Sequence, residues 1–188
     1  MRADFSAVLD ACVLLPMPLA DTLFRMAERP RLYLPKWTDE IMEEVTRNLI
    51  RRRNKTAEQA AHRQAELQKS FPEAWVDDGY KSLVSLMTND PKDRHVLAAA
   101  VRSKSEAIVT FNKKDFPPGA LQPWGVQCLG PSTFLMNLYD LDPAAVTCKL
   151  TEQSENLGIS LADLLVRLKD VVPAFVQFIC KEQGIGPL

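Results

Sequence analysis

Four acidic residues of this 188-residue chain stand where folding could bring them together to do chemistry. Asp10 directly follows an apolar run, and Glu44 and Asp93 lie beside the apolar stripes of two expected helices. Asp115 follows another apolar run, and Asn112 lies three residues before it. Carboxylates gathered in one crevice repel one another and raise each other's pKa unless a cation lies between them. Mg²⁺ or Mn²⁺ removes this conflict, and the fitting chemistry is the attack of metal-activated water on a phosphodiester.

The stretch from residue 89 to 116 is expected to form a capped helix followed by a buried strand. Asp90 is a suitable N-cap, and Pro91 suits the first helical position. Asp93 precedes two apolar residues by three and four positions, so we expect its side chain on the inward face of the helix. The apolar residues 107–109 then predict a strand that ends just before the polar cluster.

The remaining pattern predicts an α/β fold with a parallel central sheet flanked by helices. Strands are expected at 5–9, 32–34, 107–109 and 126–129, and helices at 18–27, from 38 onward, and at 56–71. Strands that alternate with helices indicate right-handed crossovers, and the ligand crevice of such sheets lies beyond the carboxyl ends of the strands. From about residue 131 only helices are expected, so we divide the chain into an α/β domain, 1–130, and a helical C-terminal extension, 131–188.

The helix that begins at Thr38 separates neighbouring glutamates by its geometry. Glu44 lies on the flank of the apolar stripe, about 100° from its centre, so it borders the core. Glu43 points almost directly away from the stripe, together with Glu40 and Arg47. We therefore expect Glu44 to face the site and the other three residues to form a solvated ion-pair face.

A basic run, Arg51, Arg52 and Arg53, follows on this helix. Cations at a helix C-terminus compensate the helix dipole, and the same cations could bind phosphate, so both interpretations stay open. Since the net charge is −1, RNA binding would have to depend on a local patch of this kind. Lys113 is a second candidate for RNA contact.

The cysteines and the N-terminus point to a cytoplasmic protein. The four cysteines are far apart and form no C-x-x-C pair, so we interpret them as small buried hydrophobic residues in a reducing compartment. A metal cluster or a disulfide framework is the less favoured alternative. Arg2 ahead of apolar residues is similar to a signal peptide, but Asp10 interrupts the run, and the run is too short to span a membrane.

Four segments, VLDACVLLP, WTDEIMEEVTRNL, NDPKDRHVLAAAV and IVTFNKKDFP, resemble in this order the motifs of PIN-domain ribonucleases. More narrowly, the chain resembles the VapC toxins of type II toxin–antitoxin pairs, over roughly residues 5 to 130. The helical remainder resembles an extension found in a subgroup of them. The resemblance implies a Mg²⁺- or Mn²⁺-dependent endoribonuclease that cuts structured RNA, often tRNA, and is silenced by a VapB antitoxin. Carried over by position, the acids are Asp10, Glu44, Asp93 and Asp115, and Asn112 stands where many relatives have a further acid.

Other interpretations stay open. Each acid alone could be an ordinary cap, turn or boundary residue, and Asn112 favours a non-catalytic RNA-binding or scaffold module on a degenerate nuclease fold. A phosphotransfer receiver or a phosphatase also places an acid after the first strand. However, a haloacid-dehalogenase-type phosphatase needs a second Asp where this chain has Cys12, and no Gly-rich phosphate loop occurs. For the helical extension, antitoxin docking, assembly of a homodimer and packing over the sheet all stay open.

Overall fold

A computed structural model describes residues 5–53 and 55–186, without the side chain of Arg53. The first part of the chain alternates strands and helices, and the last part is helical. Its elements are β1 Ser6–Leu9, α1 Ala11–Leu14, α2 Met17–Ala27, β2 Leu34–Lys36, α3 Asp39–Arg53, α4 Ala57–Ser70, η1 Pro72–Ala74, η2 Asp78–Leu86, α5 Arg94–Ser103, β3 Ala107–Val109, η3 Lys113–Asp115, α6 Pro118–Leu121, η4 Gln122–Trp124, β4 Gln127–Leu129, α7 Pro131–Leu141, α8 Pro143–Asn156, α9 Leu161–Lys169 and α10 Pro173–Glu182.

A parallel four-stranded sheet in the order β2-β1-β3-β4 lies at the centre, which confirms the predicted fold class. Strand β1 is buried along its whole length because it has a neighbour on each side. Its last residue, Leu9, is in register with Val109 of β3, which in turn is in register with Leu129 of β4. The carboxyl ends of β1, β3 and β4 therefore end side by side.

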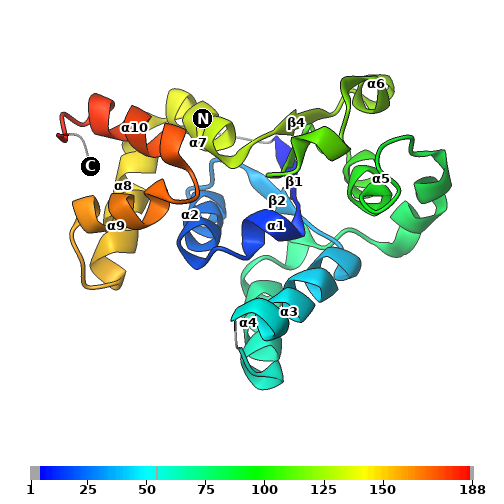
Figure 1. Cartoon of the computed structure of the whole chain (residues 1–188), viewed down its shortest axis with the longest axis horizontal. Coiled ribbons are helices and arrows are strands. Elements are labelled where there is room, and N and C mark those ends of the chain that lie inside the picture. Colours follow the sequence, from blue (N-terminus) through cyan, green and yellow to red (C-terminus); the bar gives the residue numbers. More distant parts are fainter. Residues whose placement is uncertain (1–4, 54, 187–188) are drawn as a thin grey trace.

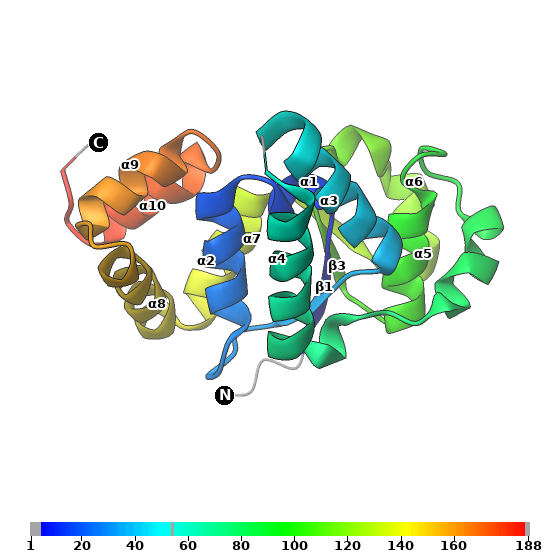
Figure 2. The same cartoon turned by 90° about the horizontal axis from the view of Figure 1, so that it is seen from below.

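Helices surround this sheet and also extend away from it. Helix α5 packs against β1 and β3, and α2 packs against β2. Both views show α5 and η2 at one end of the molecule and α8, α9 and α10 at the other, beyond α2 (Figures 1 and 2). Helix α3, which carries Glu44, and helix α5, which Asp93 directly precedes, thus belong to the sheet-containing part of the fold, and the last helices lie away from it.

Helix α7 nevertheless belongs to the core of the sheet. The ring of Phe134 lies edge-on to Tyr33, with ring centroids 4.9 Å apart, and also contacts Phe5. One cluster of buried apolar side chains continues from the sheet into α7, α8, α9 and α10. The division at residue 130 therefore stays a proposal based on the pattern of predicted elements, because the hydrophobic core is continuous across it.

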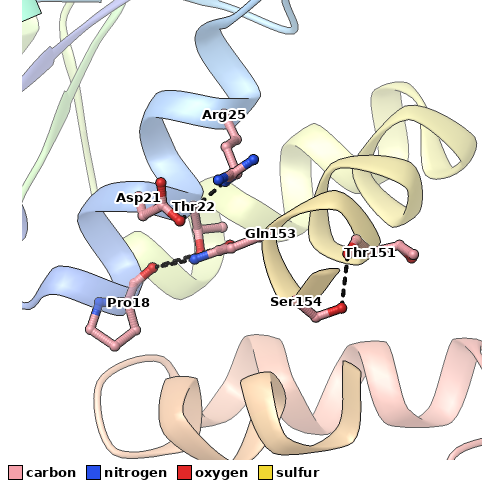
Figure 3. Close-up of polar contacts among 7 residues, drawn as sticks. All are labelled: Pro18, Asp21, Thr22, Arg25, Thr151, Gln153 and Ser154. Atoms are coloured by element: carbon pink, nitrogen blue, oxygen red, sulfur yellow. Dashed lines mark hydrogen bonds and ion pairs between the residues drawn. The ribbon is translucent and has the colours of Figure 1, made fainter. Parts of the chain in front are cut away.

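Buried polar contacts tie α8 to α2 (Figure 3). The side chain of Gln153 is fully buried, and its amide donates to the Pro18 carbonyl over 3.1 Å. The Thr22 hydroxyl lies 2.8 Å from both Gln153 Oε1 and the Pro18 carbonyl oxygen. Farther along the same helices, Lys149 Nζ donates to the Glu28 carbonyl over 3.1 Å. Since buried polar groups need partners, these contacts fix α8 in one position along α2.

Strand β2 and helix α5 differ from the prediction by more than one residue. Strand β2 covers residues 34–36 rather than 32–34, and Pro35 lies inside it, which an edge strand tolerates. Helix α5 begins at Arg94 rather than after an Asp90 cap. The Asp90 carboxylate instead accepts the Lys92 N–H over 3.0 Å, and its carbonyl accepts the Asp93 N–H. Asp90 therefore forms a turn of its own ahead of the helix.

The cysteines are all free, but the expectation that they are buried holds fully only for Cys180. Cys12 and Cys128 are partly buried, and Cys148 is exposed on α8, so the prediction was wrong for Cys148. Within the described ranges, no helix has the length and apolar character needed to cross a bilayer.

Candidate active site

Asp10 lies at the carboxyl end of β1, buried to 4% exposure. Its carboxylate accepts a 2.6 Å hydrogen bond from the hydroxyl of the fully buried Thr110, which directly follows β3. The Cys12 thiol donates to the same carboxylate oxygen over 3.2 Å. Because Asp10 N–H also bonds to the Val109 carbonyl, both the backbone and the side chain of Asp10 are held by β3 and the loop after it.

An open pocket of about 730 Å³ lies where the sheet ends, within the range of about 300–1,000 Å³ that is typical of ligand sites. Acidic side chains dominate its wall, and cations and neutral polar groups are interspersed among them. The lining carboxylates are Glu40, Glu43, Glu44, Asp90, Asp93 and Asp115, the cations are Arg47, Lys92 and Lys114, and the remaining residues are His95 and Asn112.

The carboxyl group of Asp93 is affected by the charges of other acids near the site. Burial, followed by the nearby carboxylates of Asp10 and Asp115, raises its pKa to about 6. The loop ahead of it is fixed by the backbone, since the Asp90 N–H donates to the Asp115 carbonyl over 3.1 Å. The Asp93 side chain makes no helix-capping hydrogen bond. Asp10 and Asp115 are therefore near enough to Asp93 to interact with it electrostatically, although Asp10 is not among the residues that line the pocket.

Helix α3 forms another wall of the pocket, and here the prediction was partly wrong. Glu44 is half-buried and lines the pocket as expected, but Glu40, Glu43 and Arg47 line it as well. The pocket is open to solvent, so residues away from the apolar stripe can face it. The supposed solvated ion-pair face is therefore part of the site.

Glu40 connects three elements at the side of the pocket. Its carboxylate accepts the Tyr80 hydroxyl of η2 over 3.2 Å and lies 3.9 Å from His95 Nδ1 of α5. The opposite ring nitrogen of His95 is buried and has no hydrogen-bond partner among the described residues. These contacts hold the first turn of α3 against η2 and α5, and so they set the distance between two walls.

The basic residues predicted to contact RNA lie in different places in the structure. Arg51 and Arg52 are exposed near the end of α3, and the side chain of Arg53 lies outside the described residues. Lys113 is exposed but lines a neighbouring hollow beside β4 rather than the acidic pocket. The next residue, Lys114, lines the acidic pocket instead of Lys113.

The donor set has the chemistry of a hard-cation site. Carboxylate, amide and hydroxyl oxygens are the ligands that Mg²⁺ and Mn²⁺ prefer. The raised pKa of Asp93 has burial as its main cause, and a bound cation would offset both that penalty and the repulsion from Asp10 and Asp115. Among the described residues, however, no three His, Cys, Asp or Glu side chains are arranged as ligands of one ion. The oxygen donors of the site therefore fit a divalent cation in their chemistry.

Several contributors to the site were missed from sequence. The contacts of Thr110 and Cys12 with Asp10 depend on the register between β1 and β3, which no local pattern reveals. Lys92 and Lys114 each lie next to an acid of the site in sequence, at 93 and 115, and this proximity was the available signal.

Comparisons with known proteins agree with this geometry. A sequence profile of the PIN domain matches residues 6–114, a range that includes Asp10, Glu44 and Asp93 and ends one residue before Asp115. A Mycobacterium tuberculosis (strain ATCC 25618 / H37Rv) protein named "Putative ribonuclease VapC50" is 41% identical over 112 residues. That match covers 58% of this chain and 64% of the relative, so the chain spans less than two thirds of the relative's length. No solved structure gives a significant match.

Proposed function

This chain belongs to the PIN-domain family, and from that premise we propose that it is a metal-dependent endoribonuclease, the toxin of a VapBC pair. The reaction class is supported by the relative named "Putative ribonuclease VapC50". The substrate we propose is structured RNA such as tRNA, and the compartment is the cytoplasm. The proposed cofactor is Mg²⁺ or Mn²⁺.

One observation carries this proposal: the electrostatic coupling of Asp93 with Asp10 and Asp115, three acids from separate segments of the chain. These three carboxylates would hold the cation: Asp93 and Asp115 line the pocket together with Glu44 and Asn112, and the buried Asp10 lies behind it, near enough to interact with Asp93. The bound cation would activate water and neutralise charge on a phosphodiester. Asn112 brings an oxygen but no charge, so a second cation would bind more weakly than where both positions are acids.

The protein's own side chains supply the remaining requirements. The hydrogen bond from Thr110 keeps the Asp10 carboxylate in one orientation, so less reorganisation is needed when the substrate arrives. Arg47, Lys92 and Lys114 lie among the acids and can contact RNA phosphates there. The exposed Arg51 and Arg52 would extend this contact along α3.

The test is cleavage of RNA by the purified, antitoxin-free chain with and without divalent cations. We expect cleavage with Mn²⁺ or Mg²⁺, none in EDTA, and a loss of at least about 100-fold in Asp10→Asn and Asp93→Asn. The matched control is Asp140→Asn, because Asp140 is exposed on α7 and belongs to no wall of the pocket. RNA left intact by the wild-type chain with Mn²⁺ across a range of pH would overturn the proposal.

A non-catalytic RNA-binding module is the second candidate. It is favoured by Asn112 in the pocket and by the absence of a ready-made ligand arrangement among the described residues. This candidate predicts RNA retention that is the same in EDTA and in Mn²⁺, without cleavage in either. Retention that rises with Mn²⁺ in parallel with cleavage would exclude it.

A VapB-type antitoxin as partner, and assembly as a homodimer, belong to the same proposal. The name of the relative and the order of the motifs support the antitoxin. Expression of the chain should arrest growth, and co-expression of the cognate antitoxin should release it. Size-exclusion chromatography with light scattering on the chain alone would show whether it forms dimers.

A further inference from the structure

Phe111 is an exposed aromatic residue that directly precedes Asn112, a residue of the acidic pocket. Its exposure is 41%, whereas Val109 and Thr110 just before it are fully buried. Phe116, five residues later, is 2% exposed and belongs to the hydrophobic core. Phe111 is neither in that core nor among the partly buried residues packed against it, and within the described chain its ring has no aromatic partner. The fold therefore does not use this ring for packing.

The backbone that carries Phe111 is fixed on both sides. Its N–H donates to Cys12 Sγ over 3.3 Å, and the next N–H, that of Asn112, donates to the Thr110 hydroxyl over 3.0 Å. Both accepting side chains also contact the Asp10 carboxylate. The backbone that carries the ring is thus held by the same two side chains that orient Asp10.

The residues after Phe111 show what kind of molecule could cover the ring. Asn112 and Lys114 line the acidic pocket, and Lys113 between them is exposed. A surface that binds a protein partner is expected to be a contiguous apolar patch. Here a single aromatic ring is followed directly by the amide of Asn112 and by two lysines. An aromatic face with cations beside it suits an unpaired nucleobase and its phosphates, because every base has a π-face that can stack on a ring.

We propose that Phe111 is a stacking platform for one unpaired base of the RNA, next to the phosphodiester held at the acidic pocket. This inference depends on the proposed ribonuclease function and adds how the substrate is positioned. It also assigns a requirement to the substrate: at least one base beside the cleavage position must be free of pairing.

The test measures RNA binding rather than cleavage. A single-stranded RNA of about ten nucleotides, carrying a fluorophore, is titrated with the full chain in low salt and EDTA, and its anisotropy is followed. We expect Phe111→Ala to weaken binding about tenfold and Phe111→Trp to keep it near the wild-type value. Phe111→Leu, which keeps an apolar side chain without a π-face, should resemble the alanine variant.

Trp124→Ala is the matched control. Trp124 is 38% exposed, but it precedes β4, whereas Phe111 follows β3. Since β3 and β4 are parallel, Phe111 lies beyond the carboxyl ends of these strands and Trp124 lies before their amino ends. We expect this variant to bind RNA like the wild type.

A series of RNAs, each with one abasic nucleotide, identifies stacking directly. For one position, the abasic RNA should bind the wild type about tenfold less tightly, and Phe111→Ala should then cause no further loss. If Phe111→Ala loses the same affinity for every RNA of the series, the ring does not stack on a particular base and the inference is wrong.

The failures of the inference and of the proposed function can be told apart. If the wild type cleaves RNA with Mn²⁺ but Phe111→Ala binds RNA as tightly as the wild type, only the stacking role is overturned. If Phe111→Ala weakens antitoxin binding and leaves RNA binding unchanged, the ring belongs to a protein interface instead. If the wild type neither binds nor cleaves RNA, both proposals fall.

Discussion

The replacement of Asp93 by Asn should make the metal-free protein more stable while it abolishes metal-dependent cleavage. Burial, followed by the carboxylates of Asp10 and Asp115, raises the pKa of Asp93 to about 6 from an ordinary value of 3.8. A carboxyl group with a raised pKa is held in the fold more easily when neutral than when charged. The amide of Asn is neutral at every pH and similar in shape, so it avoids the penalty without opening a cavity.

The sign of the pH effect follows from this shift. The protonated carboxyl group contributes stability that is fully present below the unfolded pKa of 3.8 and is lost as the pH rises through about 6. At pH 8 the folded protein therefore carries the full penalty of the charge. A shift of this size corresponds to about 3 kcal/mol at about 1.36 kcal/mol per pKa unit. Because Asp93 is only half-buried, solvent screening reduces the expected gain to about 1 kcal/mol, or about 2–4 °C in Tm for a chain of this size.

Thermal unfolding in EDTA at pH 8 and at pH 5, followed by circular dichroism, measures this gain. The Asn variant should melt about 2–4 °C above the wild type at pH 8, and the difference should shrink at pH 5, where wild-type Asp93 is mostly protonated in the fold. Added Mg²⁺ at pH 8 should raise the Tm of the wild type more than that of the variant.

Asp77 gives a control of opposite sign. Its hydrogen bonds from Arg102, and then from the Gly79 N–H, lower its pKa, so Asp77→Asn should lower the Tm at pH 8. A Tm of Asp93→Asn equal to or below that of the wild type at pH 8, in EDTA, would refute the reasoning, because the charge of Asp93 would then not oppose folding.

Three further changes test the roles of described side chains. Thr110→Val removes the hydrogen bond to the buried Asp10 carboxylate and should lower the free energy of unfolding in urea by about 1.5–3 kcal/mol; an unchanged value would mean that this bond adds no net stability. Gln153→Leu removes the buried hydrogen bond from the Gln153 amide to the Pro18 carbonyl, which keeps the Thr22 hydroxyl as a partner, and should cost about 0.5–1.5 kcal/mol, with RNA cleavage per folded molecule unchanged; a loss of cleavage would connect α8 to the site. Arg51→Ala combined with Arg52→Ala should weaken RNA binding and flatten its salt dependence, by about 0.7 in the logarithmic slope for each RNA phosphate that the two arginines neutralise; an unchanged slope would mean that these residues only compensate the end of α3.

Local patterns were sufficient to predict the sheet and the convergence of three acids. Asp10 interrupts an apolar run that is long enough for a central strand, and Asp115 follows a second such run. Parallel pairing places the ends of such strands at one edge, so the position of these acids follows from topology. Asp93 could be assigned because its spacing from apolar residues of α5 turns it inward.

Other parts of the site depend on tertiary structure and could not be read from one segment. Helical periodicity shows which side of α3 is apolar, but it does not show that a solvent-filled pocket opens against the polar side, where Glu43 lies. The start of α5 was misplaced because an Asp–Pro pair suits both an N-cap and an Asx turn. Here the turn at Asp90 is formed, since its carbonyl also accepts the Asp93 N–H. The contact of Thr110 with Asp10 joins residues a hundred positions apart.

The ring of Phe134 packs against Tyr33 and Phe5, so the core beside the sheet includes a residue from the C-terminal helices. The match to the PIN-domain family ends at residue 114, yet the aromatic cluster beside β1 is completed only by a helix that begins at residue 131. The stretch that matches the family is thus shorter than the stretch that packs into one hydrophobic core. A gene shortened to this matched stretch would encode Asp10, Glu44 and Asp93 but not Asp115, and it would leave hydrophobic surface of the sheet uncovered.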